Sequence, residues 1–396
     1  MPFFKGPLLA MKKLFSSASA ERRKKEHDCY LQNGSCVLEE FLALCDGNCR
    51  IPIRYYTAIE INNAIKHSKT TIMKLDSVDM VMGSLDNRPV LVRFKSSFNK
   101  FRFSINIHRD IAITAQMSHL KNVLRLVGCC LEFEQPVMVY QYVGAITLSD
   151  LLFKKVNLNR KSLCWGHRLR VARDVASAIV FLHTEFSTPI IHRNIKPFNV
   201  IIDEKSGVAK ILDFSLSISL PPGELEVVDI VCGTYGYIAP ANFASGISTQ
   251  KTDVYSFGVL LFELLIGKKA YDIRDLLVDS KTSKERTDFG EDAKSNTEEG
   301  NSMDRVDSTN SKETTDFKNV PTNYSFDHYI KEGNVLDIVD PTILEEHGIE
   351  TQQQLKDFSD LARKCIAENR DDRPYMIHVA RELSRIEKCF RALSLG

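Results

Sequence analysis

Five short motifs, placed in a fixed order along the second half of the chain, constrain its fold more than any other feature. They read H-R-x-x-K-x-x-N at 192–199, D-F at 213–214, G-T-x-G-Y-x-A-P at 233–240, D-V-Y-S-F-G at 253–258 and D-R-P at 372–374. One match of this length can arise by chance, whereas five in register indicate a single folded unit that brings them together.

The apolar pattern changes its period along the chain. Residues 70–95 are strand-rich, with the turn LDNRP at 85–89. A helix is expected at 104–118, followed by further strands at 123–133 and 136–142. From Leu148 onward the period is helical, and residues 165–184 form a long, mostly buried helix. A strand-rich region followed by a helix-rich one predicts an α+β fold with two segregated lobes.

Three ranges describe the predicted organisation. Residues 1–56 form a basic arm and an N-terminal helical extension, residues 57–143 the small strand-rich N-lobe, and residues 144–396 the larger helical C-lobe. Within the last range, residues about 279–320 are rich in Ser, Thr and charged side chains, which predicts a disordered insertion.

The N-terminal range has two parts. Residues 1–26 carry seven Lys or Arg against two Glu, so we expect a solvated, partly disordered arm, with weak attraction to an anionic membrane as the alternative. An apolar rhythm then predicts a helix from Glu26 to Leu44, ended by DGN at 46–48.

Composition excludes several classes of function. Lys and Arg total 52 against 51 Asp and Glu, so no overall field attracts nucleic acid. The longest apolar run, 257–267, is broken by Glu263 and is shorter than the roughly 20 residues that span a bilayer. The N-terminus has no secretory pattern and Pro2 precludes myristoylation, so we expect a cytoplasmic protein, with peripheral contact at the plasma membrane as the alternative.

The motif series resembles a protein kinase domain, over roughly residues 57–393. The wording around the motifs, such as LVGCC, GTYGYIAP, DVYSFGVLLFELLIGKK and DIVDP, resembles plant receptor-like kinases and their cytoplasmic relatives, near the wall-associated type. The resemblance implies a bilobal protein kinase-like fold that binds ATP between its lobes.

The nucleotide-binding residues of that family are altered here. Its phosphate-covering glycines would fall at Met73, Leu75 and Val78, so this cover is absent. Arg93 occupies the place of the strand lysine that contacts phosphates, and the nearest acid for its helix partner is Asp110. Lys95 is a fallback for the strand lysine.

The catalytic loop departs from the family in its central residue. Asn194 stands at the general-base position, and loss of a positioned base costs about 10²- to 10⁴-fold in rate. Lys196 matches the phosphate-contacting lysine, and Asn199 and Asp213 match the two metal ligands. We therefore interpret these residues, with Arg93 and Asp110, as vestigial, with no catalytic set intact.

Three further departures concern the segment that follows Asp213. The Gly after the metal-binding Asp and Phe is Ser215, and residues 220–233 contain no Ser, Thr or Tyr that could be phosphorylated to order the segment. In the family, Thr234 faces the catalytic loop. Ala241 replaces a Glu that pairs with the late arginine, here Arg373, which then needs another partner.

Within the receptor-like cytoplasmic kinases, residues 28–60 most resemble a subgroup of pseudokinases. The resemblance implies an inactive adaptor or decoy in plant immunity. Its partners would be a coiled-coil NLR immune receptor and a bacterial effector of acetyltransferase type, or another cytoplasmic kinase. It requires no cofactor and could at most bind ATP and Mg²⁺ weakly. The alternatives are a slow atypical Ser/Thr protein kinase and a nucleotide-binding pseudokinase scaffold.

Overall fold

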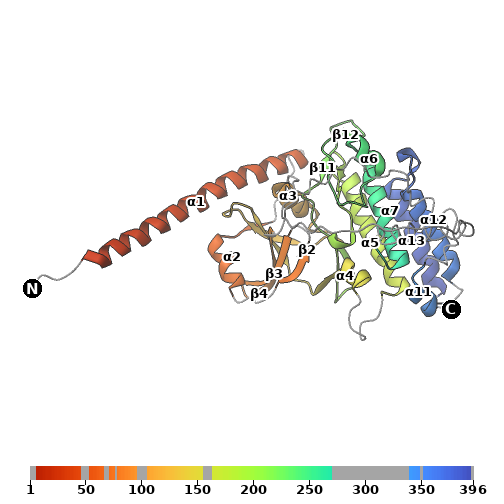
Figure 1. The fold of residues 1–396 in the computed structure, drawn as a ribbon, viewed down its shortest axis with the longest axis horizontal. Coiled ribbons are helices and arrows are strands. Elements are labelled where there is room, and N and C mark those ends of the chain that lie inside the picture. Colours follow the sequence, from red (N-terminus) through yellow and green to blue (C-terminus); the bar gives the residue numbers. More distant parts are fainter. Residues whose placement is uncertain are drawn as a thin grey trace, which may run out of the picture.

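A six-stranded sheet forms the first lobe of the molecule (Figure 1). The computed structural model describes residues 6–45, 53–66, 71–75, 78–95, 105–154, 163–269, 339–347 and 351–393. The strand order is β1-β5-β6-β4-β3-β2, with β1 parallel to β5 and the other pairs antiparallel. The strands are β1 (Arg54–Tyr55), β2 (Thr71–Leu75), β3 (Val78–Leu85), β4 (Arg88–Lys95), β5 (Leu126–Cys130) and β6 (Val137–Gln141).

The turn between β3 and β4 confirms the prediction at 85–89. Leu85 pairs with Arg88, and the two residues between them, Asp86 and Asn87, have φ values of 50° and 58°. Asp and Asn tolerate this left-handed backbone, which two-residue hairpins require. The hairpin sets the register that places Arg93 on β4.

Three helices accompany this sheet. They are α1 (Gly6–Leu44), α2 (Ala58–Ile65) and α3 (Ile107–Met117). Thr57 and Glu60 form a reciprocal capping box that starts α2. Helix α3 agrees with the predicted helix at 104–118, and Figure 1 shows the end of α1 beside it.

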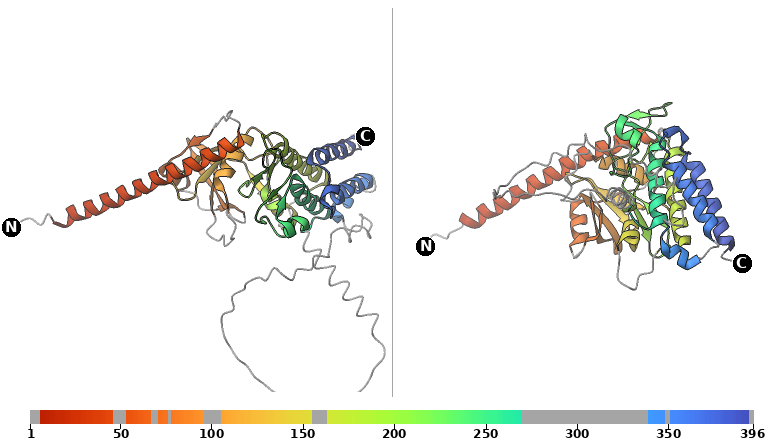
Figure 2. Two further views of the ribbon diagram at one scale, coloured as in Figure 1. Left: turned by 90° about the horizontal axis from the view of Figure 1, so that it is seen from above. Right: turned by 45° about the vertical axis from the view of Figure 1, so that its right-hand side comes forward.

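Helix α1 is longer than the sequence indicates. It ends at Leu44 as predicted, but it begins at Gly6, so the expectation of a partly disordered arm is wrong for the described part of that arm. The sequence here is rich in strong helix formers, and Pro7 lies in the first turn, where proline is tolerated. Its N-terminal half projects away from both lobes (Figure 2).

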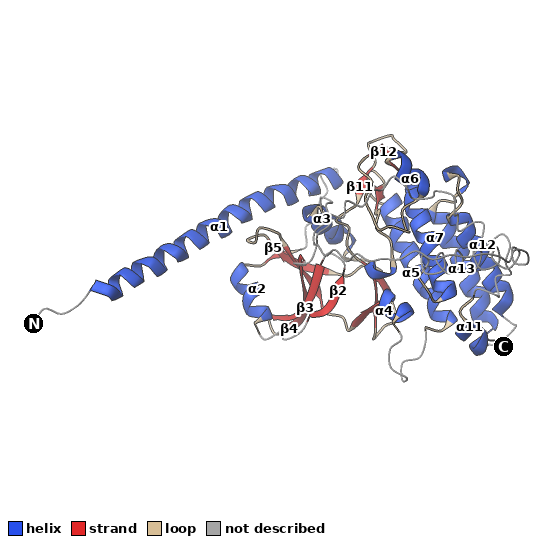
Figure 3. Cartoon of the chain, viewed as in Figure 1, coloured by secondary structure: helices blue, strands red, loops and turns tan. Residues whose placement is uncertain are grey.

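The second lobe is mainly helical, as Figure 3 shows. Its helices include α5, which has the predicted bounds of 165–184. The helical elements are α4 (Leu148–Phe153), α5 (Trp165–Thr184), η1 (Pro197–Asn199), α6 (Pro240–Ser245), α7 (Gln250–Ile266), α11 (Pro341–His347), α12 (Gln352–Cys365), η4 (Arg370–Asp372) and α13 (Met376–Leu393). The short strands after β6 are β7 (Ala145–Thr147), β8 (Ile190–Ile191), β9 (Val200–Asp203), β10 (Ala209–Ile211), β11 (Ile218–Ser219), β12 (Val227–Val228) and β13 (Ile247–Ser248).

The core of the second lobe lies between α5, α7, α12 and α13. The buried ring of Trp165 on α5 meets that of Phe358 on α12 edge to face, with centroids 5.1 Å apart. The strand-rich lobe followed by the helix-rich lobe confirms the α+β prediction. The insertion predicted at 279–320 lies outside the described residues.

None of the helices in the described ranges is both long and apolar enough to span a membrane.

Candidate functional site

The side chain of Arg93 is buried between the sheet of the first lobe, α3 and the segment that follows β10. Its guanidinium forms ion pairs with Asp110 from α3 and with Asp213, which follows β10, and the Nη2–Oδ1 distance to Asp213 is 2.7 Å. All three side chains are almost completely excluded from solvent. An ammonium is a point charge, whereas the planar guanidinium reaches two carboxylates at once. Arg93, Asp110 and Asp213 therefore form one buried network.

The carboxylate of Asp213 is already used by protein donors. Its Oδ1 accepts from Arg93 and from the hydroxyl of Ser215, which lies 2.7 Å away. Burial alone raises the pKa of a carboxyl group, but Arg93 and Ser215 hold the pKa of Asp213 below its usual value. Ser215, which replaces the family's glycine, thus donates a hydrogen bond to Asp213, the residue at the metal-ligand position. A glycine would instead give the backbone more conformational freedom.

The other contacts of Arg93 come from β6. Its Nη1 donates to the Tyr140 hydroxyl at 3.2 Å and lies 3.6 Å from the Met138 sulfur. Its Nε is buried and has no hydrogen-bond partner among the described residues. The alternative lysine, Lys95, ends β4, and its side chain lies outside the described residues.

The positions of the missing glycines fall on the hairpin of β2 and β3. Met73 pairs with Met80, and Leu75 pairs with Val78, so Met73 and Leu75 lie on β2 and Val78 begins β3. A residue with a Cβ restricts how closely a phosphate can approach the backbone. The hairpin has the strand topology of a nucleotide cover without its glycines.

In the catalytic loop, the side-chain amide of Asn194 takes part in a hydrogen-bond network. Asn194 Oδ1 accepts from the Thr234 hydroxyl at 2.8 Å, and Lys196 Nζ donates to the same hydroxyl at 2.7 Å. The side-chain amide of Asn199 donates to the Asn194 carbonyl at 2.9 Å. Asn194 can accept these hydrogen bonds as an aspartate would, but it cannot take a proton near neutral pH.

Asp253 on α7 supports the strained start of this loop. Its carboxylate accepts from the backbone N–H groups of His192 and Arg193, at 2.8 and 2.9 Å, and contacts His183 at 2.9 Å. Arg193 has a φ of 65°, a left-handed conformation that costs free energy for a residue other than glycine. The fold therefore still holds this loop in place.

The segment after Asp213 is ordered by a residue that the sequence analysis missed. Asp229 forms an ion pair with Arg193 at 2.6 Å, and its N–H donates to the Gly246 carbonyl. Although burial opposes it, Arg193 keeps the pKa of Asp229 below its usual value. A fixed carboxylate here does what a phosphorylated side chain does in switchable segments. An acid in a segment without Ser, Thr or Tyr was the available signal.

A second missed feature joins α1 to α3 and to the same segment. Arg109 on α3 forms an ion pair with Glu40 of α1 at 3.1 Å, and its Nε donates to the Ser217 hydroxyl at 3.3 Å. Nearby, Asn33 of α1 contacts His108 of α3 at 2.9 Å. Helix α1 thus braces the helix that carries Asp110. Residues Asn33, Val37, Phe41 and Leu44 form its buried face, at a spacing that lines one side of a helix.

Arg373 finds replacements for its missing glutamate partner. It donates to the backbone carbonyls of Ala367, Lys251 and Glu368, at 2.7, 3.3 and 3.2 Å. Its guanidinium carbon also lies 5.0 Å from the centre of the Tyr255 ring. Carbonyl dipoles and an aromatic face therefore compensate for Ala241.

The charged and polar side chains of this site do not fit a nucleotide bound through Mg²⁺. Asp213 is neutralised by Arg93, Lys196 donates to Thr234, and Asn194 is no base. A divalent cation would have to displace a buried guanidinium to reach Asp213, which leaves that charge unpaired. In this arrangement the carboxylate of Asp213 is paired with Arg93, and an amide stands at the general-base position.

Comparisons with known proteins identify the family of the chain. The model of the protein kinase domain matches residues 90–383. Serine/threonine-protein kinase ZRK4 of Arabidopsis thaliana is 33% identical over 370 residues, covering 91% of this chain and 92% of the relative. Non-functional pseudokinase ZRK2 of the same plant is 30% identical over 391 residues, covering 96% and 98%. Non-functional pseudokinase ZED1, also of this plant, is 36% identical over 255 residues, covering 63% and 74%.

Proposed function

The chain belongs to the protein kinase domain family, and from that premise we propose that it is a catalytically inactive, kinase-like adaptor in plant immunity. The relatives' names divide between a kinase and non-functional pseudokinases, so the names alone do not decide whether this chain transfers phosphate. The inactive assignment is supported by the site itself.

One observation carries the proposal of inactivity. Arg93 pairs with the carboxylate of Asp213, which in the family holds the metal ion. Asn194 also stands at the general-base position. Phosphoryl transfer needs both a metal ligand and a proton acceptor, and here the first is paired with Arg93 and the second is an amide. A slow atypical Ser/Thr kinase would have to break the buried ion pair in each catalytic cycle.

The adaptor role is supported by an ordered surface that presents apolar side chains. Leu225, Val228 and Ile230 lie on the segment ordered by Asp229 and are 77%, 74% and 63% exposed. Large exposed apolar side chains that lie close together in a fixed segment are typical of protein-binding surfaces. In an active kinase this segment would meet substrate, whereas here it is free to hold a partner permanently.

The partners follow from the resemblance of residues 28–60 to an immune pseudokinase subgroup. We infer a coiled-coil NLR immune receptor as the constitutive partner, with an acetyltransferase-type bacterial effector, or a second cytoplasmic kinase that such an effector modifies, as the signal. The protein would then report modification by changing its contacts with the receptor.

Nucleotide binding and partner capture test the two halves of this proposal separately. Purified protein should gain no more than about 1 °C in Tm with Mg·ATP and should show no ³³P transfer, because little stabilisation follows from weak binding. A measurable transfer that Asp213→Ala abolishes would show an active kinase. Co-purification from leaf tissue, with and without an acetyltransferase effector, should recover an NLR receptor; recovery of none in either condition overturns the adaptor role.

A further inference from the structure

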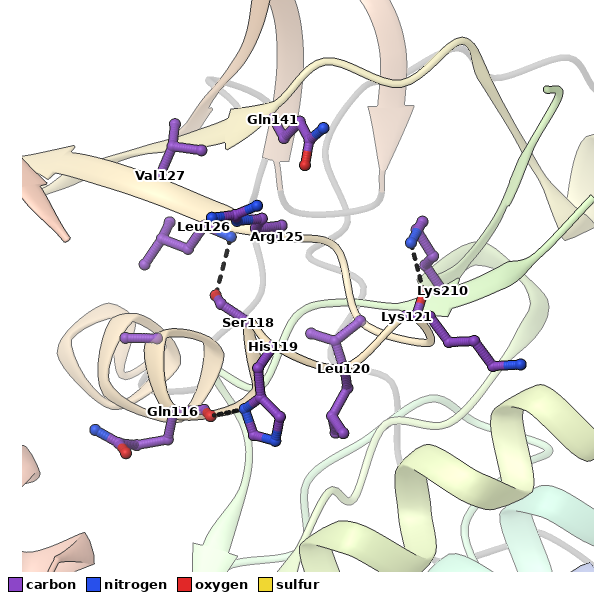
Figure 4. A pocket seen from close by; sticks show the side chains of 12 residues that line it. Gln116, Ser118, His119, Leu120, Lys121, Arg125, Leu126, Val127, Gln141 and Lys210 are labelled. Carbon is purple, nitrogen blue, oxygen red and sulfur yellow. Dashed lines mark hydrogen bonds between the residues drawn. The ribbon is translucent and has the colours of Figure 1, made fainter. Parts of the chain in front are cut away.

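A cavity of about 860 Å³ lies between the lobes, and Arg93, Asp110 and Asp213 are not among its lining residues (Figure 4). Its walls come from the loop between α3 and β5, from β5 and β6, and from β10, so both lobes contribute. A second cavity of about 630 Å³ continues it toward the β3–β4 turn. The two share Arg125, Val127 and Gln141 and form one groove.

The charge of the larger cavity has one sign. Four basic side chains line it, His119, Lys121, Arg125 and Lys210, and none of its twelve described lining residues is Asp or Glu. The smaller cavity adds Arg88, and its single acid, Asp86, pairs with Arg54. Like charges gathered in a concave site raise the local concentration of anions.

The positive charge is concentrated where the two lobes meet. Lys210 on β10 donates from Nζ to the backbone carbonyl of Lys121, which joins the second lobe to the loop between α3 and β5. Burial lowers the pKa of Lys210, and the charge of Lys121 adds to that effect, while Asp203 and Asp174 oppose it.

The cavity wall is held rigidly before any ligand arrives. Ser118 donates to the Thr114 carbonyl at 2.7 Å and accepts from the Leu126 N–H at 3.1 Å. Ile211 on β10 donates to the Asn122 carbonyl at 2.9 Å, which ties the loop to the other lobe. A preformed wall reduces the entropy that is lost when a ligand binds.

We propose that this cavity binds a small molecule that carries more than one phosphoryl group. Arg125 can present two N–H groups to one phosphate, and Lys121 and Lys210 can neutralise a second. Leu120 and Leu126 supply apolar wall for the carbon body of the ligand. The volume falls within the roughly 300–1,000 Å³ of small-molecule sites. Such a ligand bridges the lobes from behind and does not use the degenerate nucleotide cleft.

Isothermal titration of the full chain with inositol hexakisphosphate and, in parallel, with pyrophosphate tests this site. The double variant Arg125→Ala, Lys121→Ala removes two exposed cations and should weaken binding by about tenfold or more, since charged hydrogen bonds are lost. Lys210→Met should weaken it as well. Lys388→Ala, which removes an exposed charge on α13, should change the Kd by less than about twofold.

A second control separates this cavity from the nucleotide cleft. Lys196→Ala should leave the affinity for both probes unchanged, because Lys196 lies in the catalytic loop. Equal losses in Lys388→Ala and in the double variant would mean general charge attraction and overturn the site. Loss in Lys196→Ala without loss in the double variant would place the probe in the cleft, and absence of binding by both probes would also overturn the proposal.

Discussion

Arg93 and Asp213 form a buried ion pair of 2.7 Å that closes the centre of the cleft from within. The strand arginine approaches the carboxylate that would hold a metal ion, and Ser215 donates to the same oxygen. Arg93 and Ser215, two positions that depart from the family, thus donate to the same carboxylate oxygen. The two departures are therefore structurally connected. The site has become part of the protein's core.

Removing the guanidinium should strongly destabilise the protein. Arg93→Met leaves Asp110 and Asp213 buried without their cation, and breaking a buried ion pair costs about 3–5 kcal/mol. Urea unfolding measures the loss as a lower midpoint at an unchanged slope. The matched control is Arg385→Met, because Arg385 also pairs with two carboxylates but at the surface, where such pairs contribute about 0–1 kcal/mol.

The same network predicts a rescue. Adding Asp110→Asn and Asp213→Asn to Arg93→Met removes the unpaired charges and should recover part of the lost stability. If Arg93→Met cost no more than Arg385→Met, the buried network would not stabilise the cleft as described.

Restoring the base alone should not restore activity. Asn194→Asp returns a carboxylate to the catalytic loop, but Asp213 stays paired with Arg93 and the phosphate-covering glycines stay absent. Transfer of ³³P from Mg·ATP to a generic protein substrate should remain at background, with an active kinase assayed alongside. Robust transfer by Asn194→Asp would contradict the inactive assignment.

Asp229 should keep the segment after Asp213 closed. Asp229→Asn weakens the ion pair with Arg193, so backbone amides of residues 220–233 should exchange with deuterium about tenfold faster, as expected when a charged hydrogen bond is lost. Glu226→Gln is the matched control. Glu226 lies in the same segment as Asp229, but its ion pair with Arg370 of η4 is exposed. Equal exchange in the two variants would remove Asp229 from this role.

Glu40 and Arg109 should couple α1 to α3 energetically. In a double-mutant cycle of Glu40→Ala and Arg109→Ala, the interaction free energy should fall within about 0.5–3 kcal/mol, because both side chains are mostly buried and share hydrogen bonds. The pair Arg22 and Glu26, exposed within α1, should give only about 0.2–0.5 kcal/mol. A coupling near zero for Glu40 and Arg109 would mean that α1 rests on α3 without bracing it.

Buried His192 should make the fold sensitive to mild acid. Burial lowers the pKa of His192, and its Nδ1 accepts from the Asn194 N–H at 3.2 Å, which requires an unprotonated nitrogen. In the unfolded chain His192 becomes protonated near pH 6.5, whereas in the folded protein it stays neutral to lower pH. The free energy of unfolding therefore falls as the pH drops from 7 toward 5. Denaturant titrations at each pH should show a flatter profile for His192→Phe.

The exposed His27 on α1 supplies the comparison for this profile. His27→Gln should follow the wild-type pH profile, because its imidazole is in solvent. A wild-type slope in His192→Phe would assign the acid sensitivity to other groups, of which His108 is next, since burial lowers its pKa as well.

The elements of the fold could be predicted where their signals are local. Helix α5 and the β3–β4 turn have their predicted places because apolar periodicity and turn residues act over a few neighbouring positions. The start of α1 was missed because a strongly charged stretch is equally consistent with a solvated arm, and only its continuity with the part of α1 that packs on α3 favours a helix.

The candidate site divides in the same way. The sequence alone determined that Met73, Leu75, Val78 and Asn194 lack the required chemistry, because a residue's type settles whether it can bind a phosphate closely or accept a proton. The ion pair of Arg93 with Asp110 is the one that the sequence indicated, but its second partner, Asp213, was not predicted, since residue type alone does not reveal which side chains meet.

The pairing of Arg93 with Asp213 was decided by tertiary structure. Arg93 reaches Asp110 on α3 and Asp213 beyond β10 only because the sheet register aims β4 at the lobe junction. The pairs of Arg193 with Asp229 and of Arg109 with Glu40 likewise join segments that are distant in the chain. Spacing in sequence cannot specify such contacts, because they depend on how whole elements pack and on the length of each side chain. The physical reason is that ion pairing acts over a few ångströms of space, whatever the number of residues between the partners.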